Sequence, residues 1–337
     1  MKAAVYKEPG KLVIEDVSEP VAGPNEVVVK VKYVGICGSD LHFYAYAMVP
    51  PDTIMGHEVT GTIVSVGEGV RGWKEGDRIL LYFGKPCGTC PTCRKGNAHL
   101  CFNGIVVGEG TLPGGYAEYL KVFPEMLIPL PADASMKEAA LGDPVASAYR
   151  GVMLSGIKRG DSALVMGAGP IGLCVVQHLK SLGVKPLILS EPVARRGKLG
   201  VELGADVLLN PSKDDIDAEC KRLTGERGPD FVFECVGIPD TVMEAANLVR
   251  VAGKVVWVGV CMEPTTIVPV MWMLKEISIQ PSLGFTKNQM VECLELIRKK
   301  KVNAAKLISE VISLDELPRA FERLRKPNSE VKILVEF

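Results

Sequence analysis

After about residue 150, short apolar runs alternate with helix-like segments, and this alternation constrains the fold more than any other feature of the chain. Six runs have the length and composition of buried strands: Ala163–Met166, Leu187–Ser190, Val207–Leu209, Phe231–Glu234, Val255–Val260 and Ile277–Gln280. Strands separated by helices pair in parallel, and the helices cover both faces of the sheet. We therefore predict an α/β domain, a doubly wound parallel sheet, over residues 151–285.

Residues 1 to about 130 carry a different pattern. Glu26–Ile36 and Glu58–Gly67 show the alternation of β-branched residues that is typical of strands. Glycines and prolines interrupt this region at short intervals, as they do in a small barrel of short strands. The sequence therefore predicts a β-rich first domain.

The last stretch of the chain has its own signals. Gln289–Lys300 has the pattern of a helix, and Lys332–Phe337 has the pattern of a terminal strand. We expect this stretch to return to the first domain, which then comprises residues 1–150 and 286–337.

Charge, hydropathy and cysteine content restrict the classes of function. The 337 residues carry a formal net charge of −1, so nothing favours nucleic acid or an anionic membrane as a partner. No apolar run reaches the roughly 18 residues of a membrane span, and the N-terminus lacks the apolar core of a signal peptide. We therefore expect a cytoplasmic protein whose ten cysteines are reduced and available to metals.

A glycine-rich loop follows the first strand of the predicted sheet. Gly167-Ala-Gly169-Pro170-Ile171-Gly172 lies between Ala163–Met166 and a helical segment, Leu173–Ser181. Glycines at these positions allow a tight turn, close approach of the backbone to a pyrophosphate, and close packing of helix on strand. The following helix N-terminus favours the phosphate charge. This context predicts a dinucleotide-binding loop.

An acidic residue indicates which dinucleotide binds. Glu191 ends the second strand, nineteen residues after Gly172. A carboxylate there accepts the ribose hydroxyls and repels a 2′-phosphate, which favours NAD over NADP. Arg195 and Arg196 follow closely, and an arginine can accommodate that phosphate, so NADP stays open as the alternative.

Four cysteines form a compact group, Cys87, Cys90, Cys93 and Cys101. Zinc binds four thiolates tetrahedrally, and such short spacings let one loop surround the ion. A site with four protein ligands has no position for a substrate. We therefore predict a structural zinc site.

A second group of possible ligands is scattered. Cys37 and His57 are candidates for a catalytic zinc, which takes three protein ligands and keeps one exchangeable position. Asp143 is the favoured third ligand, and Glu58, beside His57, is the alternative, which can ligate directly or exchange with water. Asp40 is a candidate to orient the ring of His57, as zinc-bound histidines usually require.

These motifs together resemble the zinc-dependent medium-chain alcohol dehydrogenases, in the branch of the sorbitol and threonine dehydrogenases. The marks are Cys37-Gly-Ser39-Asp40-x-His42, Gly56-His57-Glu58, the four cysteines, Gly114-Gly-Tyr116-Ala-Glu-Tyr119 and Gly167-x-Gly169-Pro170-x-Gly172. The resemblance covers the whole chain. It implies a GroES-like catalytic domain, a Rossmann domain with the active site between them, two Zn²⁺ ions per chain, and a homotetramer, with a homodimer possible.

The resemblance also implies a reaction. Zinc acts as a Lewis acid on the hydroxyl of a small-molecule alcohol, which then gives hydride to NAD. Ser39 takes the hydroxyl proton and passes it through the nicotinamide ribose to His42 and solvent. Further cofactor contacts are implied at the ends of three successive strands: Val236, Val258, Gly259, Val260, Leu283 and Gly284.

The sequence leaves the substrate open. Sorbitol dehydrogenases place an arginine near Gly284, and this chain has none there. We hypothesise an apolar pocket for a neutral secondary alcohol, lined by Phe43, Tyr44, Tyr46, Leu283 and Phe285. The alternatives are the same machinery acting on a hydroxyacyl thioester or an enone, and a non-catalytic relative that binds nucleotide.

Overall fold

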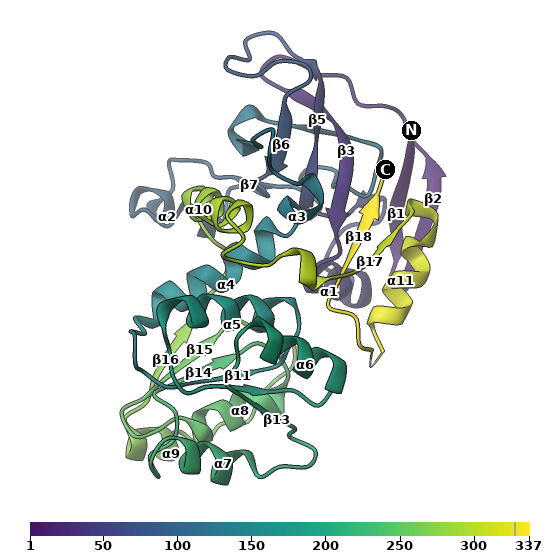
Figure 1. Ribbon diagram of the computed structural model, residues 1–337. Coiled ribbons are helices and arrows are strands. Elements are labelled where there is room, and N and C mark those ends of the chain that lie inside the picture. The colour runs from purple at the N-terminus through teal and green to yellow at the C-terminus, as the bar shows by residue number, and fades with distance from the viewer. Residues whose placement is uncertain (327) are drawn as a thin grey trace. The chain divides into compact units, whose positions relative to one another are not determined.

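The computed structural model describes residues 1–326 and 328–337. The chain forms two compact units, which Figure 1 colours by residue number. Unit 1 consists of Met1–Asp143, Thr286–Arg298 and Ile308–Phe337, and unit 2 of Pro144–Phe285 and Lys299–Leu307. Among these described residues, no helix combines the length and the apolarity needed to cross a membrane.

Unit 1 is rich in short strands. They are β1 (Lys2–Glu8), β2 (Lys11–Asp16), β3 (Val27–Gly35), β4 (Thr53–Ile54), β5 (Glu58–Val66), β6 (Arg78–Leu81), β7 (Gly84–Lys85), β8 (Ile105–Val106), β9 (Tyr119–Val122), β10 (Leu127–Pro129), β17 (Ile308–Ile312) and β18 (Lys332–Glu336). The larger sheet has the order β10-β6-β5-β3-β18-β17, with β9 also paired to β3. A second sheet has the order β2-β1-β4, and β7 pairs with β8. The predicted β-rich first domain is confirmed, and β3 and β5 are the two strands expected there.

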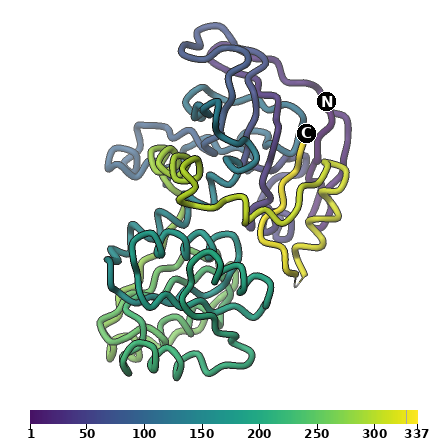
Figure 2. Tube along the Cα trace, viewed as in Figure 1, coloured from purple at the N-terminus to yellow at the C-terminus, as the bar shows by residue number. Residues whose placement is uncertain are grey.

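Most of the C-terminal segment belongs to unit 1, but the bounds differ from the expected 1–150 and 286–337: unit 1 ends its first part at Asp143, and Lys299–Leu307 belongs to unit 2. β18 pairs antiparallel with β3, with Leu334 opposite Gly35, so the yellow end of the trace lies beside an early purple strand (Figure 2). The helices of this unit are α1 (Gly38–Tyr46), α2 (Pro91–Arg94), α3 (Met136–Ala139), α10 (Lys287–Arg298) and α11 (Leu317–Leu324), with short 3₁₀ helices at Ala98–Leu100, Pro124–Met126 and Leu314–Glu316. Helix α4 (Gly142–Ser155) begins at the boundary between the units.

Helix α10 begins two residues before the predicted Gln289 and ends at Arg298. Capping explains the earlier start. The Thr286 N–H donates to Gln289 Oε1 at 2.9 Å, and the Gln289 N–H donates to Thr286 Oγ1 at 3.2 Å. This reciprocal pair satisfies backbone donors that the first turn of a helix leaves free.

Buried aromatic side chains fill one part of the unit 1 core. Tyr6, Tyr44, Tyr116 and Phe321 are all buried there. The rings of Tyr44 and Tyr116 meet Phe321 edge-on, with centroids 5.3 and 5.9 Å apart. Edge-to-face pairs of this kind add to the stability that burial provides. They anchor α11, which carries Phe321, to the segments that carry Tyr44 and Tyr116.

Unit 2 is the doubly wound sheet predicted from the sequence. Its strands are β11 (Ala163–Met166), β12 (Leu187–Ser190), β13 (Val207–Leu209), β14 (Phe231–Glu234), β15 (Lys254–Trp257) and β16 (Ser278–Pro281). They are parallel in the order β13-β12-β11-β14-β15-β16. Strands β12 and β13 are added on one side of β11 and the later strands on its other side, so the strand order reverses between β11 and β14. Helices α5 (Pro170–Leu182) and α6 (Ala194–Leu203) cover one face, and α7 (Ile216–Leu223), α8 (Pro239–Leu248) and α9 (Pro269–Lys275) the other (Figure 1). A further 3₁₀ helix spans Ala305–Leu307.

The first four strands match the predicted ranges to the residue, but β15 ends three residues before the predicted Val260. The reason lies in the neighbouring strand. The N–H groups of Val258 and Gly259 both donate to the carbonyl oxygen of Glu234, each at 2.9 Å. Two donors on one acceptor break the regular ladder, and the chain turns away from the sheet. Such a contact is not visible in an apolar run.

Candidate metal centres and cofactor site

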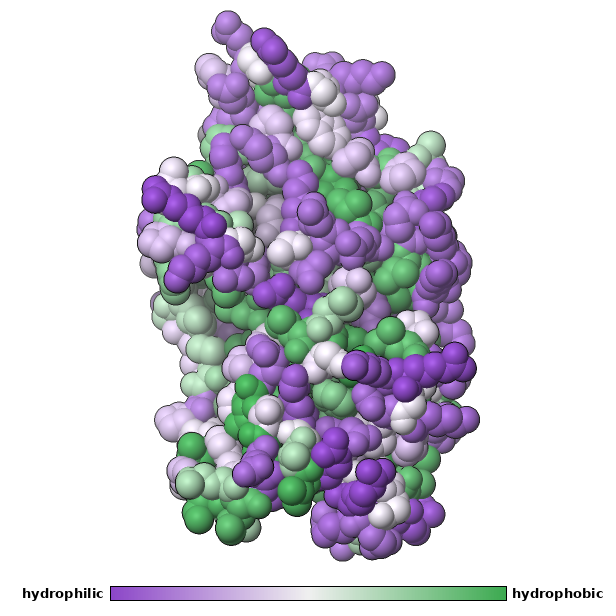
Figure 3. All heavy atoms as spheres, turned by 90° about the vertical axis from the view of Figure 1, so that its left-hand side faces the viewer, coloured by the Kyte–Doolittle hydropathy of each residue, from purple (hydrophilic) through white to green (hydrophobic). Residues whose placement is uncertain are grey.

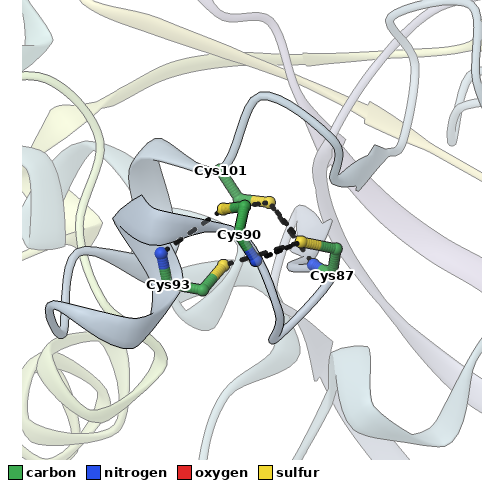
Figure 4. A group of neighbouring side chains, drawn as sticks. All are labelled: Cys87, Cys90, Cys93 and Cys101. Carbon is green, nitrogen blue, oxygen red and sulfur yellow. Dashed lines mark hydrogen bonds between the residues drawn. The ribbon is translucent and has the colours of Figure 1, made fainter.

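The four cysteines converge in one loop of unit 1, between β7 and β8. Figure 4 shows their sulfur atoms facing one another. Three of the sulfur–sulfur distances are 3.5 Å (Cys87–Cys101), 3.8 Å (Cys90–Cys101) and 4.0 Å (Cys87–Cys93). Four sulfurs held about 2.3 Å from a zinc ion in a tetrahedron stand about 3.8 Å apart. The spacing of the thiols therefore fits zinc.

Backbone N–H groups point at these sulfurs. The N–H of Cys90 donates to Cys87 Sγ at 3.4 Å, and the N–H of Cys87 donates to Cys101 Sγ at 3.3 Å. The N–H of Thr89 and then that of Cys90 lower the pKa of the Cys87 thiol to about 6. Burial and the neighbouring Cys90 thiol raise the pKa of Cys93 to about 12. The N–H of Cys93 lowers the pKa of the Cys90 thiol as well. The loop by itself thus favours the thiolate form at Cys87 and Cys90, and a cation is needed to hold four thiolates.

The pairing of β3 with β5 builds the second group of ligands. Gly35 lies opposite Glu58, so the residues after β3 and before β5 come to the same edge of the sheet. One ligand atom each from Cys37, His57 and Glu58 can be chosen so that all lie within 4.8 Å of one another. Cysteine sulfur, histidine nitrogen and carboxylate oxygen are all zinc ligands, and a set of three leaves one position free.

Asp40, in the first turn of α1, lies beside this group. Its Oδ1 lies 3.6 Å from His57 Nδ1, and its Oδ2 accepts from the Cys37 N–H at 3.0 Å and from the Tyr116 hydroxyl at 2.7 Å. Burial opposes the charge of Asp40, but His57 and these donors keep the pKa of its carboxyl below the usual value. Burial likewise opposes protonation of His57, and Asp40 outweighs it, so the pKa of His57 lies well above its usual value.

Glu58 has a buried cation as its partner. Lys332 Nζ donates to both carboxylate oxygens, at 2.7 and 2.8 Å, and to the carbonyl of Ile36 at 2.8 Å. Burial disfavours the ammonium, yet Glu58 holds the pKa of Lys332 above its ordinary value. A side chain at Gly35 would lie 1.9 Å from Glu58 Oε2, so only glycine leaves room for this carboxylate.

Asp143 is buried in the first turn of α4 and lies outside the group of three. Its carboxyl interacts electrostatically with His57, Glu58 and Lys332. Burial, partly offset by His57, raises its pKa to about 7. Of the two alternatives for the third ligand, the structure thus brings Glu58 to Cys37 and His57 and leaves Asp143 close by.

Helix α1 presents Ser39 and His42 on the turns that follow Cys37. Both side chains are half-buried. His42 Nδ1 is buried and has no hydrogen-bond partner among the described residues, and burial lowers the pKa of His42. A buried ring nitrogen without a partner is suited to a hydroxyl group of a ligand or to a water molecule.

In unit 2, the glycine loop has the geometry that the sequence predicts. Gly167 has φ +89°, and a side chain at Gly172 would lie 1.9 Å from the Gly167 carbonyl oxygen. Gly169 is the N-cap of α5, and no atom lies within 4 Å of where its side chain would be. Pro170 follows at the first position of the helix, where its missing N–H costs nothing. Backbone can therefore approach a phosphate at Gly169 and Ile171.

Glu191 is buried and holds this loop in place. Its Oε2 accepts from the Ala168 N–H at 2.6 Å and its Oε1 from the Val193 N–H at 2.8 Å. Each carboxylate oxygen can accept a second hydrogen bond, so the ribose hydroxyls of a dinucleotide still have acceptors there. Arg195 is exposed, and Arg196 is half-buried in the first turn of α6.

Apolar side chains stand at the carboxyl ends of three neighbouring strands. Val236, Val260 and Leu283 follow β14, β15 and β16 and are 44%, 50% and 68% exposed. Carboxyl ends of parallel strands are where open α/β sheets bind ligands. The other three predicted contacts, Val258, Gly259 and Gly284, lie in the same loops, and Gly284 has φ +60°.

The predicted apolar substrate pocket is partly wrong. Tyr44 and Phe285 are only 2% and 1% exposed, and the Tyr44 hydroxyl donates to Glu322 at 2.6 Å. Both rings therefore belong to cores and line no open pocket. Tyr46 and Leu283 are exposed, and Phe43 is half-buried against the unit 1 core.

Two functional candidates escaped the sequence interpretation. Lys332 is a charged residue directly before the apolar run Ile333–Val335 of the terminal strand, and that contrast is the available signal. Tyr116 stands in the sequence as part of a glycine-rich motif, and nothing there connects its hydroxyl to Asp40.

Comparison with known proteins identifies the family. The alcohol dehydrogenase GroES-like domain matches residues 23–132, and the zinc-binding dehydrogenase domain matches residues 170–299. The (R,R)-butanediol dehydrogenase of Bacillus subtilis is 35% identical over 99% of both chains, and the sorbitol dehydrogenase of Halalkalibacterium halodurans is 33% identical over 99% of both. The crystal structure of a zinc-binding dehydrogenase from Sinorhizobium meliloti, bound to NADP, superposes with a TM-score of 0.92 at 32% identity, covering 100% of this chain and 99% of that one. The chain belongs to the zinc-dependent medium-chain alcohol dehydrogenase family of oxidoreductases.

Proposed function

We propose that this protein is an NAD-dependent dehydrogenase of secondary alcohols, with Cys37, His57 and Glu58 as ligands of a catalytic zinc. The convergence of these three donors within 4.8 Å carries the proposal. When bound, zinc supplies Lewis acidity at the substrate hydroxyl, and the nicotinamide accepts hydride from the alcohol carbon.

Ser39 and His42 handle the proton in this proposal. Ser39 lies two residues after Cys37, in the first turn of α1, and in this proposal its hydroxyl takes the proton of the substrate hydroxyl. His42 lies one helical turn further along α1, and its buried Nδ1 lacks a partner among the described residues. A histidine whose pKa is lowered by burial is neutral near pH 7 and can accept the proton and release it to solvent.

The choice of NAD over NADP rests on Glu191. Its carboxylate is buried and held by two backbone N–H groups, so it cannot easily turn away from a ligand. A 2′-phosphate beside it would bring two negative charges together. The relative from Sinorhizobium meliloti binds NADP, which makes both cofactors necessary in any assay.

The substrate proposed is a neutral secondary alcohol, and diols and polyols are the first candidates. Relatives that span the whole chain are named butanediol and sorbitol dehydrogenases. No arginine stands near Gly284 to hold an anionic or highly hydroxylated substrate. The missing arginine favours a small diol over a longer polyol.

A structural zinc at the four cysteines completes the proposal, for two zinc ions per chain. Its sulfur–sulfur spacing and N–H donors support it. Such a site needs reduced thiols, which agrees with a cytoplasmic location.

We also propose a homotetramer, with a homodimer as the alternative. Strand β16 is the last strand of the unit 2 sheet, and Met273 and Leu274 of the adjacent α9 are each 73% exposed. Figure 3 shows apolar side chains gathered at the lower end of that view, within unit 2. A second copy of this chain would cover this edge and its apolar neighbours. Light scattering of the wild type and of Leu274→Glu, which gives the molar mass in solution, tests this proposed interface. The variant should dissociate, because the substitution places a charge in the interface.

A substrate panel tests the proposed activity. Diols, polyols, simple alcohols, hydroxyacyl thioesters and enones are each assayed with NAD(H) and NADP(H) by the absorbance of the reduced cofactor. We expect the highest kcat/KM for a secondary alcohol with NAD, and a large loss of kcat for Ser39→Ala and His42→Gln, about 10²-fold. Turnover of thioesters or enones but of no alcohol would refute the proposal.

A further inference from the structure

The phenol of Tyr116 is fully buried beside the proposed catalytic zinc ligands. Its hydroxyl donates to Asp40 Oδ2 at 2.7 Å, and the other oxygen of that carboxylate, Oδ1, lies 3.6 Å from His57 Nδ1. The first step is a hydrogen bond, and the second is an ion-pair distance that is longer than a hydrogen bond. Asp40 Oδ1 and His57 Nδ1 are both buried and have no hydrogen-bond partner among the described residues, so each faces the other as its nearest polar counterpart. Tyr116 itself does not belong to the group of possible ligands.

The ring of Tyr116 also supports the turn that carries His57. A side chain at Gly56 would lie 3.0 Å from three carbons of this ring, so the ring occupies the space that any other residue would need. Backbone pairing joins the same segments. The N–H of Gly115 donates to the Gly56 carbonyl at 2.7 Å, and the N–H of Tyr116 donates to the Met55 carbonyl at 3.0 Å.

We propose that Tyr116 is a positioning residue for the catalytic metal: its hydroxyl fixes the Asp40 carboxylate, which in turn fixes the ring of His57. With Nδ1 held toward Asp40, Nε2 is the ring nitrogen left for a metal ion. This inference rests on the proposed function, in which Cys37, His57 and Glu58 are the ligands.

The hydroxyl of Tyr116 has two acceptors within reach, Asp40 Oδ2 at 2.7 Å and the Gly35 carbonyl oxygen at 3.4 Å, and the shorter distance favours Asp40. Burial, and then the charge of Asp40, raise the pKa of Tyr116 well above its ordinary value, so the phenol keeps its proton and always donates. Asp40 Oδ2 has one other donor, the Cys37 N–H at 3.0 Å. Without the phenol the carboxylate is held on one side only and can rotate away from His57.

The test compares two conservative variants. Tyr116→Phe keeps the ring on Gly56 and removes only the hydroxyl. Tyr44→Phe removes the hydroxyl of another buried ring of unit 1, which donates in a less buried position to Glu322 instead. Zinc affinity at the catalytic site is measured by chelator competition, and the site geometry by the visible spectrum of the cobalt-substituted protein.

We expect Tyr116→Phe to weaken metal binding at this site about 10–100-fold and to shift the cobalt spectrum, while the four-cysteine site keeps its zinc. Tyr44→Phe should match the wild type in both measurements. An unchanged affinity and spectrum in Tyr116→Phe would overturn the inference, and so would equal changes in both variants.

Two further variants separate this inference from the proposed function. In an Asp40→Asn background, Tyr116→Phe should cause no additional loss of metal affinity, because its effect passes through Asp40. An undiminished additional loss would show a merely structural effect of the hydroxyl and overturn the inference. Cys37→Ser should lose the catalytic zinc outright. If it keeps two zinc ions, the proposed ligand set fails; if it loses one while Tyr116→Phe behaves as wild type, only the role of Tyr116 fails.

Discussion

Replacing Lys332 with methionine should leave the Glu58 carboxylate buried without its cation. The side chains of Lys332 and Glu58 are 2% and 0% exposed, and Lys332 Nζ makes three hydrogen bonds of 2.7–2.8 Å. Hydrogen bonds to charged groups contribute about 1.5–3 kcal/mol each, but removal of the lysine also removes the cost of burying an ammonium. Loss of one partner of a buried ion pair costs about 3–5 kcal/mol, and we expect this loss in the free energy of unfolding of unit 1.

A bound zinc ion should reduce this cost. If Glu58 is a zinc ligand, the metal compensates its charge when Lys332 is absent. Cys37→Ser removes a ligand and with it the catalytic zinc, so Lys332→Met should show its full cost in that background and a smaller cost in the protein with Cys37 intact. Lys332→Arg keeps the charge and serves as the control.

Tryptophan fluorescence can report on unit 1 alone. Of the three tryptophans in the chain, Trp257 and Trp272 lie in unit 2, so their replacement by phenylalanine leaves Trp73 as the probe. Urea unfolding of the four combinations of Cys37→Ser and Lys332→Met then gives the coupling free energy. Equal costs of Lys332→Met in both Cys37 backgrounds would refute the reasoning that Glu58 serves the metal.

Three further predictions concern unit 2. His178 is buried with Nε2 3.1 Å from the Val145 carbonyl oxygen, and burial lowers its pKa to about 4. Because this histidine binds its proton near pH 6.5 in the unfolded chain, the free energy of unfolding should fall by up to about 3 kcal/mol as the pH drops from 6.5 to 4. Urea unfolding at several pH values should show a smaller pH dependence of this free energy for His178→Gln than for the wild type. An equal pH dependence in the two proteins would contradict the prediction. Glu191→Ser should raise KM for NAD by about 10-fold or more and reduce the preference for NAD over NADP. An unaltered ratio of kcat/KM with NAD to kcat/KM with NADP would refute the role assigned to Glu191. Gly172→Ala should abolish cofactor binding in calorimetry, because its methyl group would lie 1.9 Å from the Gly167 carbonyl oxygen; normal binding would contradict the geometry of the loop.

Much of the fold could be predicted because its signals are local. The runs that became β11 to β14 are three or four residues each, most of them buried, and turns or loops bound them closely. The end of β15 could not be predicted, because it depends on Glu234, whose carbonyl takes two N–H groups from the following turn. A single sequence shows no such contact between strands.

The candidate site likewise has parts with local sequence signals, which could be predicted, and parts that depend on long-range contacts, which could not. The four cysteines lie within one loop, so their spacing alone indicates a metal. The Glu58–Lys332 pair joins residues 274 apart, and the Tyr116–Asp40 bond joins residues 76 apart. The aromatic pocket failed for a related reason, since Tyr44 is covered by Phe321 and Glu322 from the returning C-terminal segment.

Zinc content measured together with turnover tests the central claim most directly. The wild type should contain two zinc ions per chain and oxidise a secondary alcohol with NAD. Cys37→Ser should keep one zinc ion, at the four cysteines, and lose all turnover. Two zinc ions with full turnover in Cys37→Ser would contradict the proposed catalytic site, and loss of both ions would contradict the independence of the two sites.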